Sequence, residues 1–222
     1  MKPTRGAVVG VRRILGPRPP QAPIIMTAVP GSGFSNHVWN APVYLSRQVI
    51  RPLSRSLLNF EAGMDAVEAA AETATQAGVP ILLNPAPVAP HSPELLTKAS
   101  VLVVNEVEAA AIAQGANGDH AAELAALRRF APRAVVTLGA GGLVAADAAE
   151  SFALPAFPVT AVDSVGAGDA FCAALGVRLC EGAGLFEAAR FAAAAGALAV
   201  TRSGAQSALP SREEVERFLA DA

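Results

Sequence analysis

Short runs of mostly apolar residues without polar alternation recur along the chain, and they constrain its fold more than any other feature of the sequence. The runs cover residues 57–61, 79–84, 101–105, 134–138, 143–147 and 157–162. A strand with no polar face is typical of a sheet that is covered on both sides. Because helical segments alternate with several of these strands, the sequence predicts an α/β fold of Rossmann type, a mostly parallel sheet sandwiched by helices.

Helical periodicity predicts what connects these strands. Apolar residues recur every three or four positions within 63–77, and Gly78 is placed to end that helix. Asp119 can cap another helix, and Ser211 has the spacing from Glu214 that a capping box requires. Helices are predicted over residues 63–77, 106–113, 119–130, 168–179 and 186–200, with a last one after Ser211.

The composition of the chain changes abruptly near residue 60. Residues 1–60 contain eight Lys or Arg and no Asp or Glu, whereas residues 61–222 contain nine basic and nineteen acidic residues. We therefore divide the chain into an unassigned basic, proline-rich segment, 1–56, and a folded part, 57–222. Three interpretations of the first segment stay open: a cleaved targeting peptide, a disordered basic tail, and the product of a shifted reading frame.

The chain as a whole has the composition of a globular protein with a sizeable core. It is 52% apolar and 16% charged, with a net charge of −2. This composition excludes wholesale disorder and provides no electrostatic footprint for nucleic acid. No apolar run reaches the roughly 18–20 residues of a membrane span, so we expect neither nucleic acid nor a membrane as a partner.

The few cysteines and histidines form no recognisable disulfide or metal pattern. Cys172 and Cys180 on one helix would lie ~12 Å apart, beyond the ~7 Å between Cα atoms that a disulfide allows. His37, His91 and His120 are scattered along the sequence. We therefore expect two buried, reduced thiols in a reducing, cytoplasmic compartment, and no metal site built on histidine.

Polar or glycine-rich segments follow four of the predicted strands, which is where ligands bind to parallel sheets. The segments are Asn84–Pro87, Asn105–Glu108, Thr137–Gly142 and Asp163–Asp169. Each of the first three also has a purely structural explanation, as a rigid turn, a helix start or a hairpin turn. The fourth is more specific, because Gly166–Asp169 at a helix start leaves backbone N–H groups pointing at one spot, which makes an anion site.

Asp169 is the one ionisable residue within that anion site. A carboxylate beside a bound anion is electrostatically unfavourable unless it accepts a proton there. A general base for phosphoryl transfer does this. The sequence therefore predicts phosphoryl transfer at the start of this helix, with Asp169 as the base.

Residues 57–222 resemble the C-terminal part of the ribokinase-like (PfkB) carbohydrate kinases. The segment Asp-Ser-Val-Gly-Ala-Gly-Asp-Ala-Phe (163–171) is similar to the most specific signature of that family. The three other segments named above and Thr201–Gln206 follow in the family's order, at plausible spacings. The resemblance implies an ATP-dependent kinase that phosphorylates the 5-hydroxyl of a small-molecule sugar, D-ribose, with Mg²⁺ and an activating K⁺.

The resemblance also implies roles for individual residues. Asp169 would be the base that meets the sugar hydroxyl, and Glu61 would also contact the sugar. The transferred phosphoryl group would be bound by the N–H groups of Gly166, Ala167, Gly168 and Asp169. The nucleotide would be bound by Asn105, Thr137, Leu138, Gly139, Ala140, Gly141, Gly142 and Gly168. The cations would be held by Glu108 with Asn105 for Mg²⁺ and, for K⁺, by Asp163 with carbonyls near Val165, Ala199, Arg202 and Gly204.

The chain departs from the family at single positions and in one larger respect. Asn59 stands in place of a more usual Gln, Ala193 in place of a polar residue near adenine, and Ala208 in place of a Ser at the K⁺ site. Nothing in residues 1–56 matches the family's N-terminal strands, its sugar loop or the β lid through which its members dimerise. We therefore expect little activity from this chain. Two alternatives stay open: a non-catalytic ATP-binding module, and a kinase for another sugar or a nucleoside.

Overall fold

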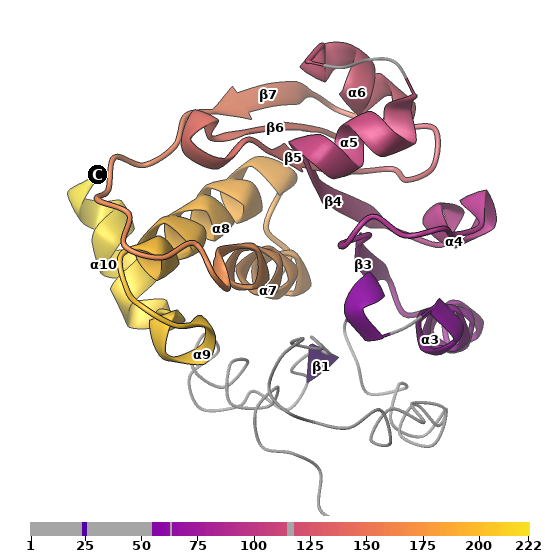
Figure 1. Cartoon of the computed structure of the whole chain (residues 1–222), viewed down its shortest axis with the longest axis horizontal. Helices are drawn as coiled ribbons and strands as arrows, with labels where there is room; N and C mark the ends of the chain where they lie inside the picture. The colour runs from indigo at the N-terminus through magenta and orange to yellow at the C-terminus, as the bar shows by residue number, and fades with distance from the viewer. Residues whose placement is uncertain (1–23, 26–54, 63, 115–117) are drawn as a thin grey trace, which may run out of the picture.

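The chain folds around one seven-stranded sheet whose strands lie side by side in the order of the sequence (Figure 1). The computed structural model describes residues 24–25, 55–62, 64–114 and 118–222. The strands are β1 (Ile24–Ile25), β2 (Ser56–Asn59), β3 (Ile81–Asn84), β4 (Val101–Asn105), β5 (Ala134–Thr137), β6 (Leu143–Ala146) and β7 (Ser151–Leu154). β1 to β5 pair in parallel, whereas β6 and β7 pair antiparallel. The predicted mostly parallel sheet is therefore confirmed.

Helices cover both faces of this sheet, as the uninterrupted apolar strands predict. In Figure 1, α7 and α8 lie on one face, and α3 to α6 lie on the other. The helices are α3 (Met64–Gln76), α4 (Pro93–Thr97), α5 (Glu106–Ala113), α6 (His120–Leu127), α7 (Ala167–Cys180), α8 (Leu185–Val200), α9 (Ala205–Ala208) and α10 (Arg212–Asp221), with 3₁₀ turns at Phe60–Ala62 and Gly139–Gly141. Sequence periodicity does not predict α4 or α9, because four or five residues are too few to show a helical repeat.

Alternate residues of the central strands point into two separate apolar cores. Val103 and Val135 pack on the side of α7 and α8, whereas their neighbours Val104 and Val136 pack on the side of α3 to α6. All four side chains are buried. These strands show no polar alternation because both of their faces are removed from water.

α7 and α8 pack closely against each other because both present small residues at their interface. Ala192 and Ala195 of α8 are fully buried. A Cβ atom built at Gly196 would lie 3.5 Å from the carbonyl oxygen of Ala167, at the start of α7. The fit between the two helices thus helps to fix the first turn of α7, which contains Asp169.

The segment 157–162 is not a strand, and the last strand of the sheet, β7, precedes it. Pro155 and Pro158 cannot donate backbone hydrogen bonds to a ladder. The N–H of Val162 donates to the carbonyl oxygen of Val200 at 2.7 Å, so the segment reaches the end of α8. The prediction of a strand at 157–162 is therefore wrong. The other five predicted strands are confirmed to within two residues at each end.

The predicted caps and free thiols are confirmed. Asp119 accepts hydrogen bonds from the N–H groups of Ala121 and Ala122, both at 3.1 Å, and caps α6. The capping box predicted for the last helix is also present at the start of α10. Both cysteines are free; one is buried, and the other is partly buried at the end of α7. None of the helices described here is long and apolar enough to cross a membrane.

The basic segment 1–56 is described at residues 24–25 and 55–56 alone. β1 pairs in parallel with β2, with Ile24 opposite Ser56 and Ile25 opposite Leu57. The three interpretations of this segment lie outside the described residues, and the division of the chain at residue 57 stays a prediction.

Candidate active site

The parallel strands bring polar residues to one edge of the sheet, at their carboxyl ends. Asn59 of β2 pairs in register with Asn84 of β3, and Asn105 of β4 pairs in register with Thr137 of β5. Ligands of α/β sheets bind at this edge. Strand register therefore brings together three of the four segments that the sequence predicts to converge.

The Asn84–Pro87 segment acts as a brace between strands. The side-chain amide of Asn84 donates to the carbonyl oxygen of Val103 in β4 at 2.8 Å. Two residues later, the carbonyl oxygen of Ala86 accepts from the N–H of Phe60 at 2.9 Å. The structural explanation of this segment is thus correct, and the second bond holds the turn that carries Glu61.

Two carboxyl groups, those of Glu61 and Asp169, lie near each other at this edge. Burial raises the pKa of Glu61 to about 7, and the negative charge of Asp169 adds to that shift. Burial also raises the pKa of Asp169. The fourth predicted segment, which ends at Asp169, therefore reaches the same site as the end of β2.

The carboxyl pair lies among polar atoms that lack hydrogen-bond partners within the described residues. Oε2 of Glu61 and Oδ1 of Asn59 are buried without a partner there. An unpaired buried acceptor costs free energy unless a donor reaches it. The site therefore offers acceptor oxygens suited to a ligand that carries several hydroxyl donors.

The two glycines at the start of α7 have different local constraints. Gly166 has φ of 81°, and a Cβ atom there would lie 3.1 Å from the Cα of Ala205, so a side chain is excluded by conformation and by contact. A Cβ atom at Gly168 would meet nothing within 4 Å. The first N–H groups of a helix have no intrahelical partner. That of Ala167 donates to the carbonyl oxygen of Ser164 at 3.3 Å, and the space at Gly168 leaves an approach to the next ones. This arrangement fits a phosphate.

Asp163 joins the loop before α7 to the turn after α8. Its Oδ2 accepts from the N–H of Gly204 at 2.9 Å, and its Oδ1 accepts from the N–H of Val165 at 3.0 Å. These two donors, Gly204 first, hold the pKa of Asp163 below its usual value. The carboxylate oxygens keep further lone pairs, which suits a cation ligand, whereas the predicted carbonyl of Ala199 already accepts from the N–H of Arg202 at 3.2 Å.

The predicted magnesium residues Asn105 and Glu108 bind each other. Oε2 of Glu108 accepts from the backbone N–H of Asn105, and Oε1 accepts from its side-chain amide, both at 2.9 Å. Glu108 is 5% exposed, and burial raises its pKa while these bonds oppose the shift. Glu108 in this arrangement does not fit a direct metal ligand. It orients Asn105, whose side chain is exposed.

The glycine-rich segment Thr137–Gly142 is the hairpin connection between β5 and β6. The N–H of Leu138 donates to the carbonyl oxygen of Gly142 at 2.8 Å. Gly142 has φ of 92°, and a Cβ atom there would overlap the backbone at Leu154 and Ala156. The tips of this turn, from Gly139 to Gly141, are exposed beside Asn105 at the end of β4. The N–H of Gly141 donates within the turn to the carbonyl oxygen of Leu138 at 2.8 Å, so what this turn offers a nucleotide is mainly an exposed surface without bulky side chains.

The three departures from the family pattern are buried or partly buried positions. Ala208 is fully buried, and Asn59 is 4% exposed. Ala193 is partly buried and packs against the core on the side of α7 and α8. Side chains at these positions contribute to packing, except that Asn59 also supplies the unpaired oxygen beside Glu61.

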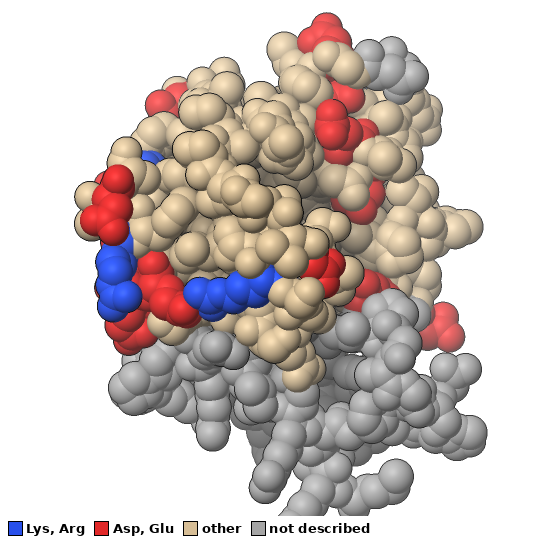
Figure 2. Space-filling model, turned by 60° about the vertical axis from the view of Figure 1, so that its left-hand side comes forward, with Lys and Arg blue, Asp and Glu red and all other residues tan. Residues whose placement is uncertain are grey.

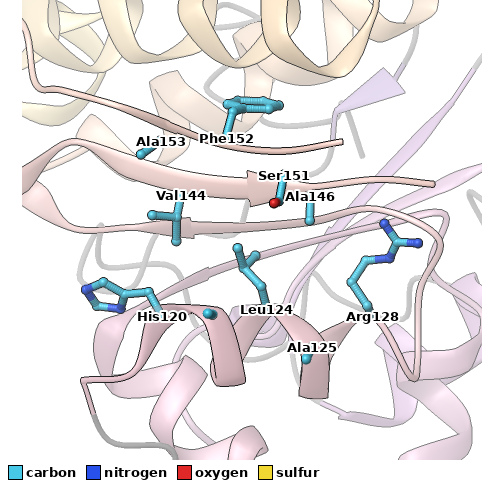
Figure 3. A pocket seen from close by; sticks show the side chains of 10 residues that line it. His120, Leu124, Ala125, Arg128, Val144, Ala146, Ser151, Phe152 and Ala153 are labelled. Atoms are coloured by element: carbon cyan, nitrogen blue, oxygen red, sulfur yellow. The ribbon is translucent and has the colours of Figure 1, made fainter. Parts of the chain in front are cut away.

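A pocket of about 470 Å³ lies elsewhere, between α6 and the β6–β7 hairpin (Figure 3). Its lining includes His120 and Leu124 of α6, Arg128 directly after that helix, and Val144 and Ser151 of the two strands. None of the predicted site residues lines it. The predicted site is an edge of the sheet, and this pocket is separate from it.

Sequence reasoning missed a long-range ion pair behind the site. Nη2 of Arg202, in the turn after α8, donates to Oε1 of Glu214 in α10 at 2.6 Å. Local pattern predicts Glu214 as a helix cap and nothing more. No sequence signal links it to a residue twelve positions earlier.

The sequence is similar to a family of sugar kinases and to individual ribokinases. Residues 48–212 match the sequence profile of the pfkB family of carbohydrate kinases. The ribokinase of Haemophilus influenzae is 34% identical over 192 residues, which make up 85% of this chain and 63% of the relative. The ribokinase of Bacillus subtilis is 38% identical over 141 residues, or 64% of this chain and 46% of the relative. The chain thus spans between 46% and 63% of the length of these relatives.

Solved structures of ribokinases have the same fold. The ribokinase of Thermotoga maritima superposes with a TM-score of 0.69 at 32% identity, over 79% of this chain and 61% of that one. The ribokinase of Arabidopsis thaliana, solved in complex with ribose and ATP, superposes with a TM-score of 0.70 at 28% identity, over 78% and 58%. The match to Haemophilus covers more of this chain than residues 57–222 contain, so it extends into the basic segment.

Proposed function

The chain belongs to the pfkB family of carbohydrate kinases, and on that premise we propose that the whole protein is a ribokinase. It transfers the γ-phosphoryl group of ATP to the 5-hydroxyl of D-ribose. The observation that carries this proposal is the position of Asp169, which lies in the first turn of α7 next to the open space at Gly168 and near enough to Glu61 for its charge to help raise the pKa of Glu61. A base, a hydroxyl-binding acceptor and a phosphate-binding helix start are thereby brought together.

In the proposed reaction, the carboxylate of Asp169 takes the proton of the sugar hydroxyl. The hydroxyl oxygen forms a bond to the γ-phosphorus, the bond from that phosphorus to the bridging oxygen breaks, and ADP leaves. The raised pKa makes Asp169 a better proton acceptor, because catalytic bases work best when their pKa lies near the ambient pH. The N–H groups from Gly166 to Asp169 stabilise the charge on the transferred group.

Glu61 and Asn59 are proposed to bind the sugar. Their buried, unpaired oxygens would accept hydrogen bonds from ribose hydroxyls, which compensates the cost of burying them. Ribose carries several hydroxyl groups, and the Arabidopsis relative was solved with ribose bound. Glu61 reaches the site because the turn of Phe60–Ala62 is held by Ala86.

The nucleotide is proposed to lie along the exposed Gly139–Gly141 turn, with its phosphates towards Asn105 and Gly168. Thr137 and Leu138 lead into that turn, and Ala140 and Gly142 complete it. A nucleotide at this position would have its γ-phosphoryl group directed towards the start of α7. ATP is bound in solved relatives of this fold.

Two cations are proposed to support the reaction. Asn105, oriented by Glu108, would face the Mg²⁺ that accompanies ATP. Asp163 would hold K⁺ with carbonyls near Val165, Ala199, Arg202 and Gly204. The ions would neutralise the charge of the phosphates, and the named residues would hold the loops around them.

The free thiols of the two cysteines fit a cytoplasmic location for the proposed kinase. A homodimer, which the family resemblance implies only for full-length members, is proposed for the whole protein alone.

A second candidate function follows from the length of the match. The chain spans 46–63% of the curated relatives it matches, so it would act as a non-catalytic ATP-binding module if its sugar site were incomplete. A ribokinase and a non-catalytic module would both bind ATP, but only the ribokinase would turn over ribose. A kinase for another sugar or a nucleoside is distinguished by the acceptor that supports turnover.

The test is an assay of ribose-dependent ADP formation with the full chain, Mg²⁺ and K⁺. Asp169→Asn should lower turnover by about 10²- to 10⁴-fold, the usual contribution of a general base. Asp147→Asn is the matched control, because Asp147 lies at the β6–β7 turn, away from the site. Turnover that survives in Asp169→Asn overturns the assignment of the base. Stabilisation by ATP without ribose-dependent turnover supports the binding module instead.

A further inference from the structure

The carboxylate of Glu214 is shared between two parts of the chain. Its Oε2 accepts from the backbone N–H of Ser211 at 2.6 Å and so caps α10. Its Oε1 accepts from the guanidinium of Arg202 at 2.6 Å. The side chains of Arg202 and Glu214 are 34% and 33% exposed, so the pair is partly shielded from water. Glu214 therefore connects the start of α10 to the turn that follows α8.

The turn that follows α8 is also hydrogen-bonded to the loop before α7. The N–H of Gly204 donates to Asp163, which also accepts from Val165. The carbonyl oxygen of Val200 accepts from the N–H groups of Val162 and Asp163 at 2.7 and 3.1 Å. The segments 162–165 and 200–204 are thus bonded to each other through both backbone and side chain.

The same two segments are in steric contact where α7 begins. A Cβ atom at Gly166 would lie 3.1 Å from the Cα and 3.2 Å from the carbonyl oxygen of Ala205. Gly166 is the N-cap of α7, and Asp169 lies in its first turn. Because Gly166 and Ala205 are packed directly against each other, a displacement of residues 201–205 would also displace the start of α7.

We propose that Glu214 is a positioning residue: through Arg202 it holds the 201–204 turn against Asp163 and thereby sets the position of the α7 N-terminus. The importance of that position for phosphoryl transfer rests on the proposed function. The structural coupling itself does not. On this proposal α10 contributes to the active site although none of its side chains contacts a substrate.

Hydrogen exchange of the full chain, without any ligand, tests the coupling directly. Glu214→Gln keeps an acceptor for the cap, since Gln also serves in a capping box, but removes the charge that binds Arg202. We expect exchange of amides within residues 163–169 and 201–206 to become about two- to fivefold faster. Glu216→Gln is the matched control, because Glu216 lies on the same helix and pairs with Arg212 at 3.3 Å. Basic and acidic side chains lie next to each other at the left-hand side of the face in Figure 2, so such pairs are a general feature of this surface. It should leave both segments unchanged.

Variants of Arg202 separate positioning from general stability. Arg202→Lys keeps a cation that can bind Glu214, so it should retain most of the protection from hydrogen exchange in residues 163–169. Arg202→Gln should lose that protection. The double variant Arg202→Gln, Glu214→Gln should exchange no faster than either single variant, because one interaction is removed in all three. Additive effects, or equal effects of Glu214→Gln and Glu216→Gln, overturn the proposal.

A kinetic measurement then connects the coupling to catalysis. Glu214→Gln should lower kcat by about two- to fivefold and leave the KM for ribose unchanged, because the proposed sugar acceptors lie on β2 and its turn. A change in exchange without any change in kcat overturns the catalytic part. If the unsubstituted chain shows no turnover, the proposed function fails, while the exchange result still decides whether Glu214 positions α7.

Discussion

At the scale of single residues, the charge of Glu61 depends on the site around it. Burial, with the negative charge of Asp169, raises the pKa of Glu61 from its ordinary value of 4.5 to about 7 in the folded protein. The folded state therefore binds a proton more tightly than the unfolded state does. Between pH 4.5 and about 7, rising pH lowers the stability of the folded protein, since the folded state then holds more protons.

We predict that Glu61→Gln removes this pH dependence. The free energy of unfolding of the unsubstituted protein should fall relative to that of Glu61→Gln as the pH rises from 4.5 towards 7. Urea unfolding at several pH values measures the difference between the two proteins. A difference that stays constant across this range contradicts the prediction, and Glu68→Gln, on an exposed part of α3, serves as the control.

A second prediction concerns the two glycines at the start of α7. Gly166→Ala should destabilise the protein by about 1–3 kcal/mol, because alanine is strained at positive φ and its Cβ meets Ala205. Gly168→Ala has no such contact, and should change the free energy of unfolding little while its methyl group obstructs a bound phosphate. Thermal unfolding and ATP titration of both variants check this. Equal destabilisation by both substitutions would show that the local geometry differs from the one described.

At the scale of single elements, α6 tests how much a cap contributes. Asp119 accepts from two N–H groups at the start of α6, which covers one face of β5 and β6. Asp119→Ala should therefore cost about 1 kcal/mol, and Asp119→Asn should cost only a few tenths because Asn also caps. Urea unfolding of the two variants measures the difference. If Asp119→Asn lowered the free energy of unfolding as much as Asp119→Ala does, the charge of Asp119 would matter rather than its capping hydrogen bonds.

The elements that the sequence predicts best are those with a strong local pattern. The run Val101–Asn105 and the helix at 106–113 are found at the predicted residues, because buried strands and helix caps leave signals within a few positions. The strand at 151–154 has only a short, weak alternation, while 157–162 has the right composition but two nearby prolines. Composition alone therefore misplaced the last strand.

Within the site, too, the sequence predicts contacts between nearby residues better than contacts between residues far apart in the chain. Strand register places Asn105 beside Thr137 as expected, and it also places Asn59 beside Asn84, which the sequence did not predict. The approach of Glu61 to Asp169 joins residues more than a hundred positions apart and was expected only through the family resemblance. The capping box between Asn105 and Glu108 follows from the local sequence, and the plain interpretation of it as a helix start is correct. The pair of Arg202 with Glu214 required the fold.

At the scale of the whole molecule, the sheet separates two cores that lie on opposite faces. Leu82 packs with α7 and α8, whereas the next residue, Leu83, packs with α3 to α6. Each is almost completely buried. The two positions on one strand therefore report on the two cores independently.

We predict that Leu82→Ala and Leu83→Ala each destabilise the protein by about 2–5 kcal/mol, the range for deletion of a buried leucine side chain. Both should shift a single unfolding transition, because β3 belongs to both cores. Circular dichroism in urea measures the shift, and Val107→Ala at an exposed position is the control. Two separated transitions in either variant would contradict a single cooperative unit.

The order of the strands has a consequence while the chain is being made. Each strand from β2 to β7 can pair with one that has already left the ribosome, because the sheet follows the order of the sequence. The face covered by α3 to α6 can close in that same order. The opposite face waits for α7 and α8, which emerge after every strand. A nascent chain that ends before residue 167 therefore lacks the two helices that pack on this apolar face, and at that stage chaperone binding and aggregation compete with folding.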